Sequence, residues 1–302
     1  MTSALRSPAS RPVVPTAVPL GDAVAERAAV YAARMNAGDF SVALRAGRLA
    51  KPDYVAFLAL MYPLVVGFNR ALIRSISKVD HVRRSSFVRV LAKQLEEEQV
   101  HNQLWRDTLE AFGVDHEALY DDLEAYLAGF DCAELDRLTE SVLSAVTRGD
   151  VDDDDGAGSI FPNAPFPDAV LALYHQLWIG ASRDDIGYWE HFAGQAAIEM
   201  IIFDVVSTSI LPGICGDPAL DLGRASTAWW REHGEAPGEE NLASEEKRHL
   251  ELSRIALNRS GLDAATRSRV LHRAESVMRL FAATLLCQPL AAPSDALAKF
   301  LR

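Results

Sequence analysis

The sequence predicts an all-α protein with a single helical domain. Apolar residues recur every three or four positions through most of the chain, whereas the two-residue alternation of strands is nearly absent. No repeat of fixed period is present, which argues against a solenoid. The 302 residues are 49% hydrophobic, enough for a large core. We therefore expect one bundle of helices around a common core.

The expected helices follow one another with short breaks. Lys51-Pro52-Asp53 predicts a helix start, because proline is favoured in the first helical turn. Gly113 predicts a helix end, and so does Pro212-Gly213. The expected ranges are 20–36, 54–76 (opened by 51–53), 83–112, 116–127, 134–147, 167–177, 184–211, 220–233, 239–259 and 264–286.

The composition of the first residues predicts where the helical domain begins. Residues 1–20 contain four prolines and several Ser and Ala residues but no continuous apolar core, which predicts a disordered leader rather than a signal peptide. The helical domain then covers 21–302. No uncharged apolar run reaches the roughly 18–20 residues of a membrane-spanning helix, so we expect no membrane contact.

The acidic stretch 150–159 (DVDDDDGAGS) does not fit the pattern of a calcium-binding loop. With Gly156 at the sixth position, the first position is Val151 and the twelfth is Pro162. An EF-hand needs an acid and a glutamate there. We therefore expect a solvated acidic loop.

Charge and cysteine content exclude several classes of function. A net charge of −12 argues against nucleic acid or an anionic membrane as partner, since both require basic surfaces. Cys132, Cys215 and Cys287 are scattered and form no Cys-x-x-Cys pair. This favours a reducing cytoplasm and disfavours disulfides or a thiolate zinc site. We expect a cytoplasmic protein that acts on a small molecule, with a homodimer left open.

Two Glu-x-x-His tetrads, Glu98–His101 and Glu246–His249, are the main chemical signal. Positions i and i+3 of a helix share a face, so each tetrad presents two metal ligands in one direction. Such pairs on bundle helices hold two iron or manganese ions. Glu98 and His101 also interrupt an apolar stripe, where an unpaired charge costs several kcal/mol. The competing interpretation is a surface glutamate cluster beside a partly buried histidine.

Glu199 lies in a helix that is apolar on all sides. From Phe192 to Val206 the only other charged residue is Asp204. A helix with this pattern is buried, and buried acids are paired, protonated or bound to metal. Glu199 is therefore a candidate ligand, with a structural salt bridge as the alternative.

The predicted metal-ligand set contains six residues and leaves two choices open. His233 follows Trp229 and Trp230, where packing or hydrogen bonding competes with a ligand role. Glu97 could replace Glu98, and Glu245 could replace Glu246. Oxygen and nitrogen ligands without thiolates suit iron or manganese better than copper or structural zinc. The set is Glu98, His101, Glu199, His233, Glu246 and His249.

Residues 91–120 (LAKQLEEEQVHNQLWRDTLEAFGVDHEALY) resemble the haem-oxygenase-like di-iron oxidases, which are related in fold to thiaminase-like TenA and PqqC proteins. In that superfamily a glutamate-rich helix runs into a ligand histidine and then a stretch rich in aromatic residues and leucine. The segments YVAFLALMYPLVVGFNRALI and AGQAAIEMIIFDVV are also similar to family helices. The resemblance spans about residues 50–260 and implies a haem-oxygenase-like helical bundle.

The resemblance also implies a cofactor and a ligand pattern. Two iron ions, O2 as co-substrate and an external reductant are expected, with Glu199 as the central carboxylate. The last ligand helix of the family usually carries His-x-x-x-Asp/Glu-x-x-His, but Leu242 occupies the first histidine position here. His233 is the expected replacement, with 234–242 as an insertion.

The implied reaction is oxidation of a small metabolite in specialised metabolism. N-oxygenation of an amine or amino-heterocycle is favoured, and oxidative C–C cleavage or decarboxylation of an amino or fatty acid is the alternative. Five aromatic residues fit a substrate pocket for either reaction, with ordinary core packing as the alternative: Trp105, Trp189, Phe203, Trp229 and Trp230.

Three other hypotheses are kept. A ferritin-like four-helix bundle would need a carboxylate on the helix before the first tetrad, but 54–76 has none beyond its first turn and Glu26 is the nearest earlier one. A metal-free thiaminase-like enzyme would need a reactive cysteine. A metal-free interaction protein would need satisfied core acids.

Overall fold

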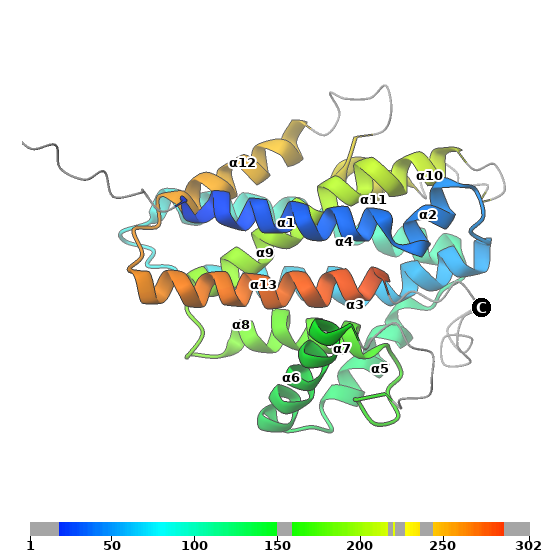
Figure 1. The fold of residues 1–302 in the computed structure, drawn as a ribbon, viewed down its shortest axis with the longest axis horizontal. Coiled ribbons are helices and arrows are strands. Elements are labelled where there is room, and N and C mark those ends of the chain that lie inside the picture. The colour runs from blue at the N-terminus through cyan, green and yellow to red at the C-terminus, as the bar shows by residue number, and fades with distance from the viewer. Residues whose placement is uncertain (1–17, 150–158, 217–219, 221–226, 236–243, 287–302) are drawn as a thin grey trace, which may run out of the picture.

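The computed structural model describes residues 18–149, 159–216, 220, 227–235 and 244–286, and these residues form helices and no β-strand (Figure 1). The predicted all-α class is confirmed. The elements are α1 (Leu20–Ala37), α2 (Asp39–Arg45), α3 (Lys51–Ser77), α4 (Ser85–Ala111), α5 (His116–Leu127), α6 (Cys132–Arg148), α7 (Asp168–Tyr174), η1 (His175–Ile179, a π-helix), α8 (Gly180–Ser182), α9 (Tyr188–Val205), η2 (Val206–Ile210, a π-helix), α10 (Leu211–Gly216), α11 (Ala228–His233), α12 (Ser244–Asn258) and α13 (Ala264–Leu286).

Helix α9 lies at the centre of the bundle. It packs against α1 and α13, which run side by side across Figure 1. Helix α3 packs against α4, and α13 also contacts α6 and α7. The apolar run from Phe192 to Ile201 explains this position, because residues on every side of this stretch are buried. The stretch of α9 that carries Glu199 is therefore covered on all sides.

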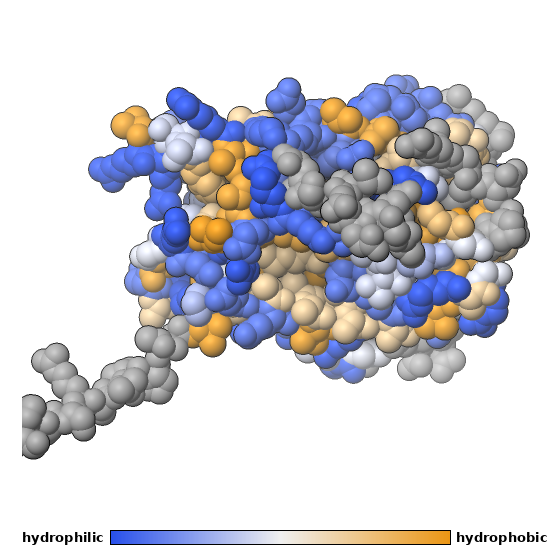
Figure 2. Space-filling model, turned by 90° about the horizontal axis from the view of Figure 1, so that it is seen from above, coloured by the Kyte–Doolittle hydropathy of each residue, from blue (hydrophilic) through white to orange (hydrophobic). Residues whose placement is uncertain are grey.

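Helices α3 and the continuous run Tyr188–Gly216 are long and apolar enough to cross a membrane if an occasional charge is allowed. The expectation that no uncharged apolar run reaches about 18 residues holds, and both helices reach that length only by including charged residues. Within the bundle, 72% and 56% of the apolar windows of these two helices are buried, as in core helices of soluble proteins. The face shown in Figure 2 is largely hydrophilic, with hydrophobic residues in scattered patches.

Several element boundaries differ from the predictions. The expected helix 167–177 is α-helical only to Tyr174 and continues as the π-helix η1. The expected helix 184–211 begins later, at Tyr188, and passes Pro212 to end at Gly216. We attribute the tolerance of Pro212 to the wide π-helical turn of η2 directly before it, which leaves room for the proline ring. The short helix α2 was not predicted because seven residues give little periodicity.

Three predicted segments extend beyond the described residues. The leader at 1–20 falls outside them except for its last three residues, and α1 begins at Leu20. The acidic loop at 150–159 also falls outside them except for Ser159. Of the expected helices 220–233 and 239–259, the described parts are α11, α12 and the isolated residue Leu220.

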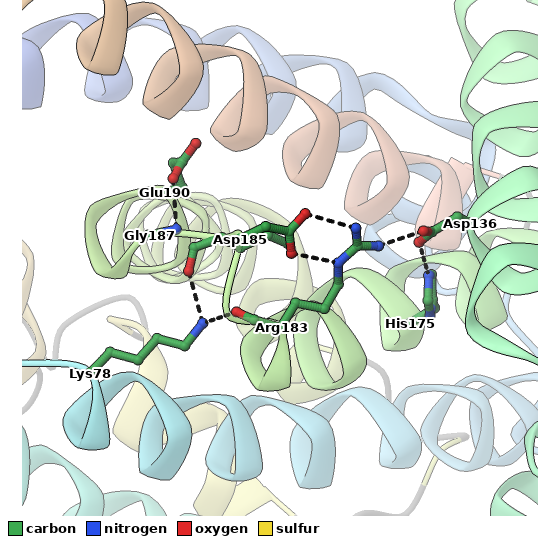
Figure 3. A network of polar contacts seen from close by, with 8 residues as sticks. Lys78, Asp136, His175, Arg183, Asp185, Gly187 and Glu190 are labelled. Atoms are coloured by element: carbon green, nitrogen blue, oxygen red, sulfur yellow. Dashed lines mark hydrogen bonds and ion pairs between the residues drawn. The ribbon is translucent and has the colours of Figure 1, made fainter.

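A polar network fixes the start of α9 (Figure 3). Lys78, which directly follows α3, donates to the carbonyl of Ile186 at 2.8 Å. Arg183 forms ion pairs with Asp185 and Asp136, and His175 Nε2 lies 3.0 Å from Asp136 Oδ1. The network ties the segment before α9 to α3 and α6, so the position of α9 along the bundle is set from two sides.

Helix α12 lies on α1 through a close backbone approach. The Gly21 N–H donates to Asn258 Oδ1 at 2.7 Å, and Arg254 pairs with Asp22 at 2.9 Å. A side chain at position 21 would clash with the carbonyl of Arg254, so glycine is required for this contact. The first helix of the chain therefore positions the helix that carries the second tetrad.

Candidate metal centre

The structure brings all six predicted ligands into one neighbourhood inside the bundle. Five of these side chains are buried, and that of His101 is only 12% exposed. We call this set the ligand cluster: Glu98 and His101 from α4, Glu199 from α9, His233 from α11, and Glu246 and His249 from α12. Their role as metal ligands stays a prediction.

Glu98, His101 and His233 form the most compact part of the ligand cluster. Each offers one ligand atom, and the three atoms lie within 4.8 Å of one another. His101 Nδ1 is 3.4 Å from Glu98 Oε2, and the rings of His101 and His233 are 4.3 Å apart between centroids. This spacing suits three groups around one cation.

The tautomer of His233 follows from its hydrogen bond. Its Nδ1 lies 2.9 Å from the backbone carbonyl of Trp229, and a carbonyl can only accept. Nδ1 therefore carries the proton, and the lone pair of Nε2 is left for a metal. Histidines that bind metals are usually oriented by such a bond from the other ring nitrogen.

The second tetrad lies beside a further glutamate. His249 Nδ1 is 4.0 Å from Glu246 Oε2, and His249 Nε2 is 2.9 Å from Glu97 Oε2. Glu98 thus lies in the compact triad, whereas Glu97 lies next to His249, and the choice between them as ligand stays open. Leu242 and the side chain of Glu245 lie outside the described residues.

Gln94 is a site residue that the sequence analysis missed. Its side-chain amide donates to Glu199 Oε1 in the buried interior. Its spacing in the sequence could have indicated this role, because Gln94 lies one turn before Glu98 on the same face of α4. Asn69 on α3 donates to the Glu98 carbonyl at 3.0 Å and holds α4 against α3 at this level.

The electrostatics of the ligand cluster disfavour ionisation of two of its glutamates in the metal-free protein. Burial raises the pKa of Glu199 well above its ordinary value, and the charges of Glu246 and Glu98 raise it further. Burial, with the charge of Glu98, raises the pKa of Glu246 to about 8. In the described part of the chain, no Lys or Arg forms an ion pair with Glu98, Glu199 or Glu246. The donor set therefore fits divalent cations, which would hold these carboxylates ionised.

The pKa values of the two histidines in the compact triad shift in opposite directions. Burial, helped by the positive charge of His101, lowers the pKa of His233 well below its ordinary value. Burial also opposes ionisation of His101, but the carboxylates of Glu98 and Glu246 outweigh it and raise the pKa of His101. His233 is thus neutral at physiological pH, which is the form that binds metals.

The pKa of Glu246 predicts how stability of the metal-free protein depends on pH. Between its ordinary pKa near 4.5 and its folded pKa of about 8, the folded protein holds a proton that the unfolded chain releases. The stability of the metal-free folded protein therefore falls as pH rises through that window. Glu246→Gln should raise the unfolding temperature by several degrees at pH 8 and change it little at pH 5. Thermal unfolding of metal-free wild type and variant at both pH values measures this, and an equal difference at both would contradict it. Glu96→Gln, on the exposed face of α4, is the control.

An apolar cavity adjoins the ligand cluster. Its accessible volume of about 70 Å³ is several times the ~10–15 Å³ that one water requires, so it can admit a ligand. Glu98, Glu199 and His233 line it, and every other lining residue is apolar. We call it the apolar cavity.

Four of the five predicted pocket aromatics line one of two sites. Trp105, Trp229 and Trp230 line the apolar cavity, whereas Trp189 lines a more open groove between α4, α9 and α12 and Phe203 lines neither. Gln94 and His249 also line this groove, so it reaches the ligand cluster from a different side.

Comparisons with known proteins identify the fold. No protein-family model and no curated protein sequence matches the chain. The crystal structure of a TenA homolog from Pseudomonas syringae pv. tomato str. DC3000 is similar, with a TM-score of 0.57, over 91% of this chain and 95% of that chain. This chain has a TenA-like fold. Sequence identity is 14%, so the likeness concerns the fold alone.

The TenA-like fold confirms part of the resemblance stated from sequence. The all-helical, TenA-related architecture is confirmed, and membership of the di-iron oxidases stays a proposal. The ferritin-like alternative gains no support, because Glu26 is exposed on α1 and no carboxylate of α3 joins the ligand cluster.

Proposed function

We propose that this protein is a cytoplasmic, O2-dependent non-haem di-iron oxidase. The observation that carries the proposal is the ligand cluster: buried carboxylates and imidazoles from four helices converge without an ion pair to Lys or Arg among the described residues for Glu98, Glu199 and Glu246. Buried acids in such numbers must be protonated or offset by cations, and the imidazoles beside them supply the other ligands that a metal ion needs. Carboxylate and imidazole ligands without thiolate favour iron or manganese.

Each part of the ligand cluster has a distinct role in this proposal. Glu98, His101 and His233 would hold one ion, and Glu246 and His249 the other. Glu199 would join the two, because its pKa responds to both Glu98 and Glu246. When bound, the two iron ions supply electrons to O2, and an external reductant restores them. Gln94 orients the Glu199 carboxylate, and the apolar cavity excludes water from the substrate side.

N-oxygenation of an amine or amino-heterocycle is the first reaction type that we propose. The apolar lining of the cavity favours a second candidate, oxidative C–C cleavage of an aliphatic carboxylic acid. A metal-free thiaminase-like activity would require a nucleophilic cysteine in the pocket. Cys132 and Cys215 are exposed and do not line the cavity, and Cys287 lies outside the described residues.

Iron reconstitution tests the proposal directly. Protein loaded anaerobically with Fe(II) should bind about two irons per chain and give a transient visible absorption band when O2 is added. Turnover of parallel amine and carboxylic acid panels, followed by O2 consumption and product mass, then identifies the reaction type. Protein that binds no iron under these conditions would contradict the oxidase.

Replacing His233 should remove one metal ion. His233→Ala should reduce bound iron from about two per chain to about one, because His233 completes the triad with Glu98 and His101. Elemental analysis after reconstitution measures the change. His191→Ala is the matched control, since His191 is similarly buried but lies outside the ligand cluster. Unchanged iron in His233→Ala would make His233 a packing residue against Trp229.

A further inference from the structure

The apolar cavity is elongated along the helices that line it. Glu199 and Ile210 both line it, and Ile210 lies eleven residues further along the continuous run of α9 and η2. At about 1.5 Å per residue this separation is roughly 15 Å, shortened slightly by the π-helical turn. The lining residues of α3, Phe57 to Phe68, span a similar length.

The two ends of the apolar cavity differ in chemistry. Phe68 lies at the polar end, because its carbonyl accepts a hydrogen bond from Gln195, one turn before Glu199. Phe57 lies at the far end, where it stacks on Trp230 with ring centroids 5.9 Å apart. The indole N–H of Trp230 donates to Tyr54 at 2.8 Å, so Trp230 presents an apolar surface. Among the described lining residues the polar side chains are Glu98, Glu199 and His233, with His233 stacked on Trp229, and the wall around Ile210 is apolar.

The π-helical segments contribute to the walls. Leu177 belongs to η1, and Val206 and Ile210 belong to η2. π-helical turns occur frequently at functional sites. Two such segments line this cavity, which is consistent with a functional site.

We propose that the apolar cavity binds the hydrocarbon chain of a linear aliphatic substrate, with its single polar end at Glu98, Glu199 and His233. The identity of the reacting end rests on the proposed function, whereas binding of the chain does not. A hydrocarbon chain matches the apolar walls along the whole length. A polar body such as a sugar or a dipeptide would lose its hydration without gaining hydrogen bonds, which costs several kcal/mol.

Binding to metal-free protein tests the proposal separately from catalysis. The probes are two series of straight-chain compounds, carboxylates from hexanoate to dodecanoate and amines from hexylamine to dodecylamine, titrated calorimetrically. Each added CH2 that enters the cavity should raise affinity about fourfold. The increase should stop at the chain length that reaches Ile210. Either head group supports the proposal, and the stronger series identifies the preferred polar end.

Two variants at the far end make opposite predictions. Ile210→Phe fills the end of the cavity and should weaken binding of the longest tolerated chain at least tenfold, with little change for hexanoate. Ile210→Ala opens the end and should extend the fourfold increase to longer chains. Ile73→Phe, at a half-exposed position of α3 outside the cavity, is the matched control and should change neither series.

The outcomes separate this proposal from the proposed function. Affinity that is independent of chain length, or unmoved by both Ile210 variants in folded protein, overturns the aliphatic substrate even if two irons bind. Chain-length selection in a protein that binds no iron supports the cavity assignment and contradicts the oxidase.

Discussion

Glu199→Ala should abolish iron binding in a protein that stays folded. Glu199 is the charged residue in the buried stretch of α9, and its pKa responds to carboxylates of both tetrads. Its removal therefore affects both metal positions, unlike the loss of His233. We expect bound iron to fall from about two per chain to well below one, measured by elemental analysis after anaerobic reconstitution.

A second substitution separates loss of metal from loss of fold. Glu199→Gln keeps the shape of the side chain and removes its charge. The metal-free variant should unfold at a higher temperature than metal-free wild type at pH 8, because burial favours the protonated form of Glu199 in the folded protein at a pH where the unfolded chain has released that proton. The variant should nevertheless bind little iron. Glu96→Ala, on the exposed face of α4, should retain full iron content. Full iron content in Glu199→Ala would remove Glu199 from the proposed centre.

Trp105→Ala should cost about 3–5 kcal/mol of unfolding free energy, the range for truncating a buried tryptophan. Trp105 is 1% exposed, and its Nε1 donates to the Leu58 carbonyl at 3.3 Å. It also packs edge to face on Trp229 and Trp230, with centroids 4.5 and 5.2 Å away. Urea unfolding followed by circular dichroism measures the loss.

Trp189→Ala provides the comparison for that measurement. Trp189 is partly exposed at the groove, so its truncation should cost clearly less than that of Trp105. Equal costs for the two variants would show that the aromatic cluster of Trp105, Trp229 and Trp230 is not a main part of the core.

The ligand cluster was predictable because it depends on local spacing. An i, i+3 pair shares a helix face whatever the tertiary structure, and a lone acid in an all-apolar helix is buried wherever that helix packs. The sequence left Glu97 and Glu98 open, since both lie near the core-facing side of α4. The structure separates them by their neighbours, His249 for Glu97 and His101 for Glu98.

The apolar cavity was not predictable because it depends on helices distant in sequence. Met35 of α1 and Phe281 of α13 line it together with Ile210, and no local pattern places these three side chains in one wall. The π-helical segments were also missed, since a single wide turn leaves the apolar periodicity on either side nearly intact. The expected helix end at Pro212-Gly213 was wrong, because the sequence does not reveal the π-helical turn directly before Pro212.

The contact between Gly21 and Arg254 has a consequence for the order of events during synthesis. The ribosome makes α1 first and α12 late, and α12 reaches its place only by folding back onto α1. Until then Glu98, His101 and Glu199 are present without Glu246 and His249. In the proposed metal centre, Glu246 and His249 would therefore join the other ligands only after α12 has been synthesised and has folded onto α1.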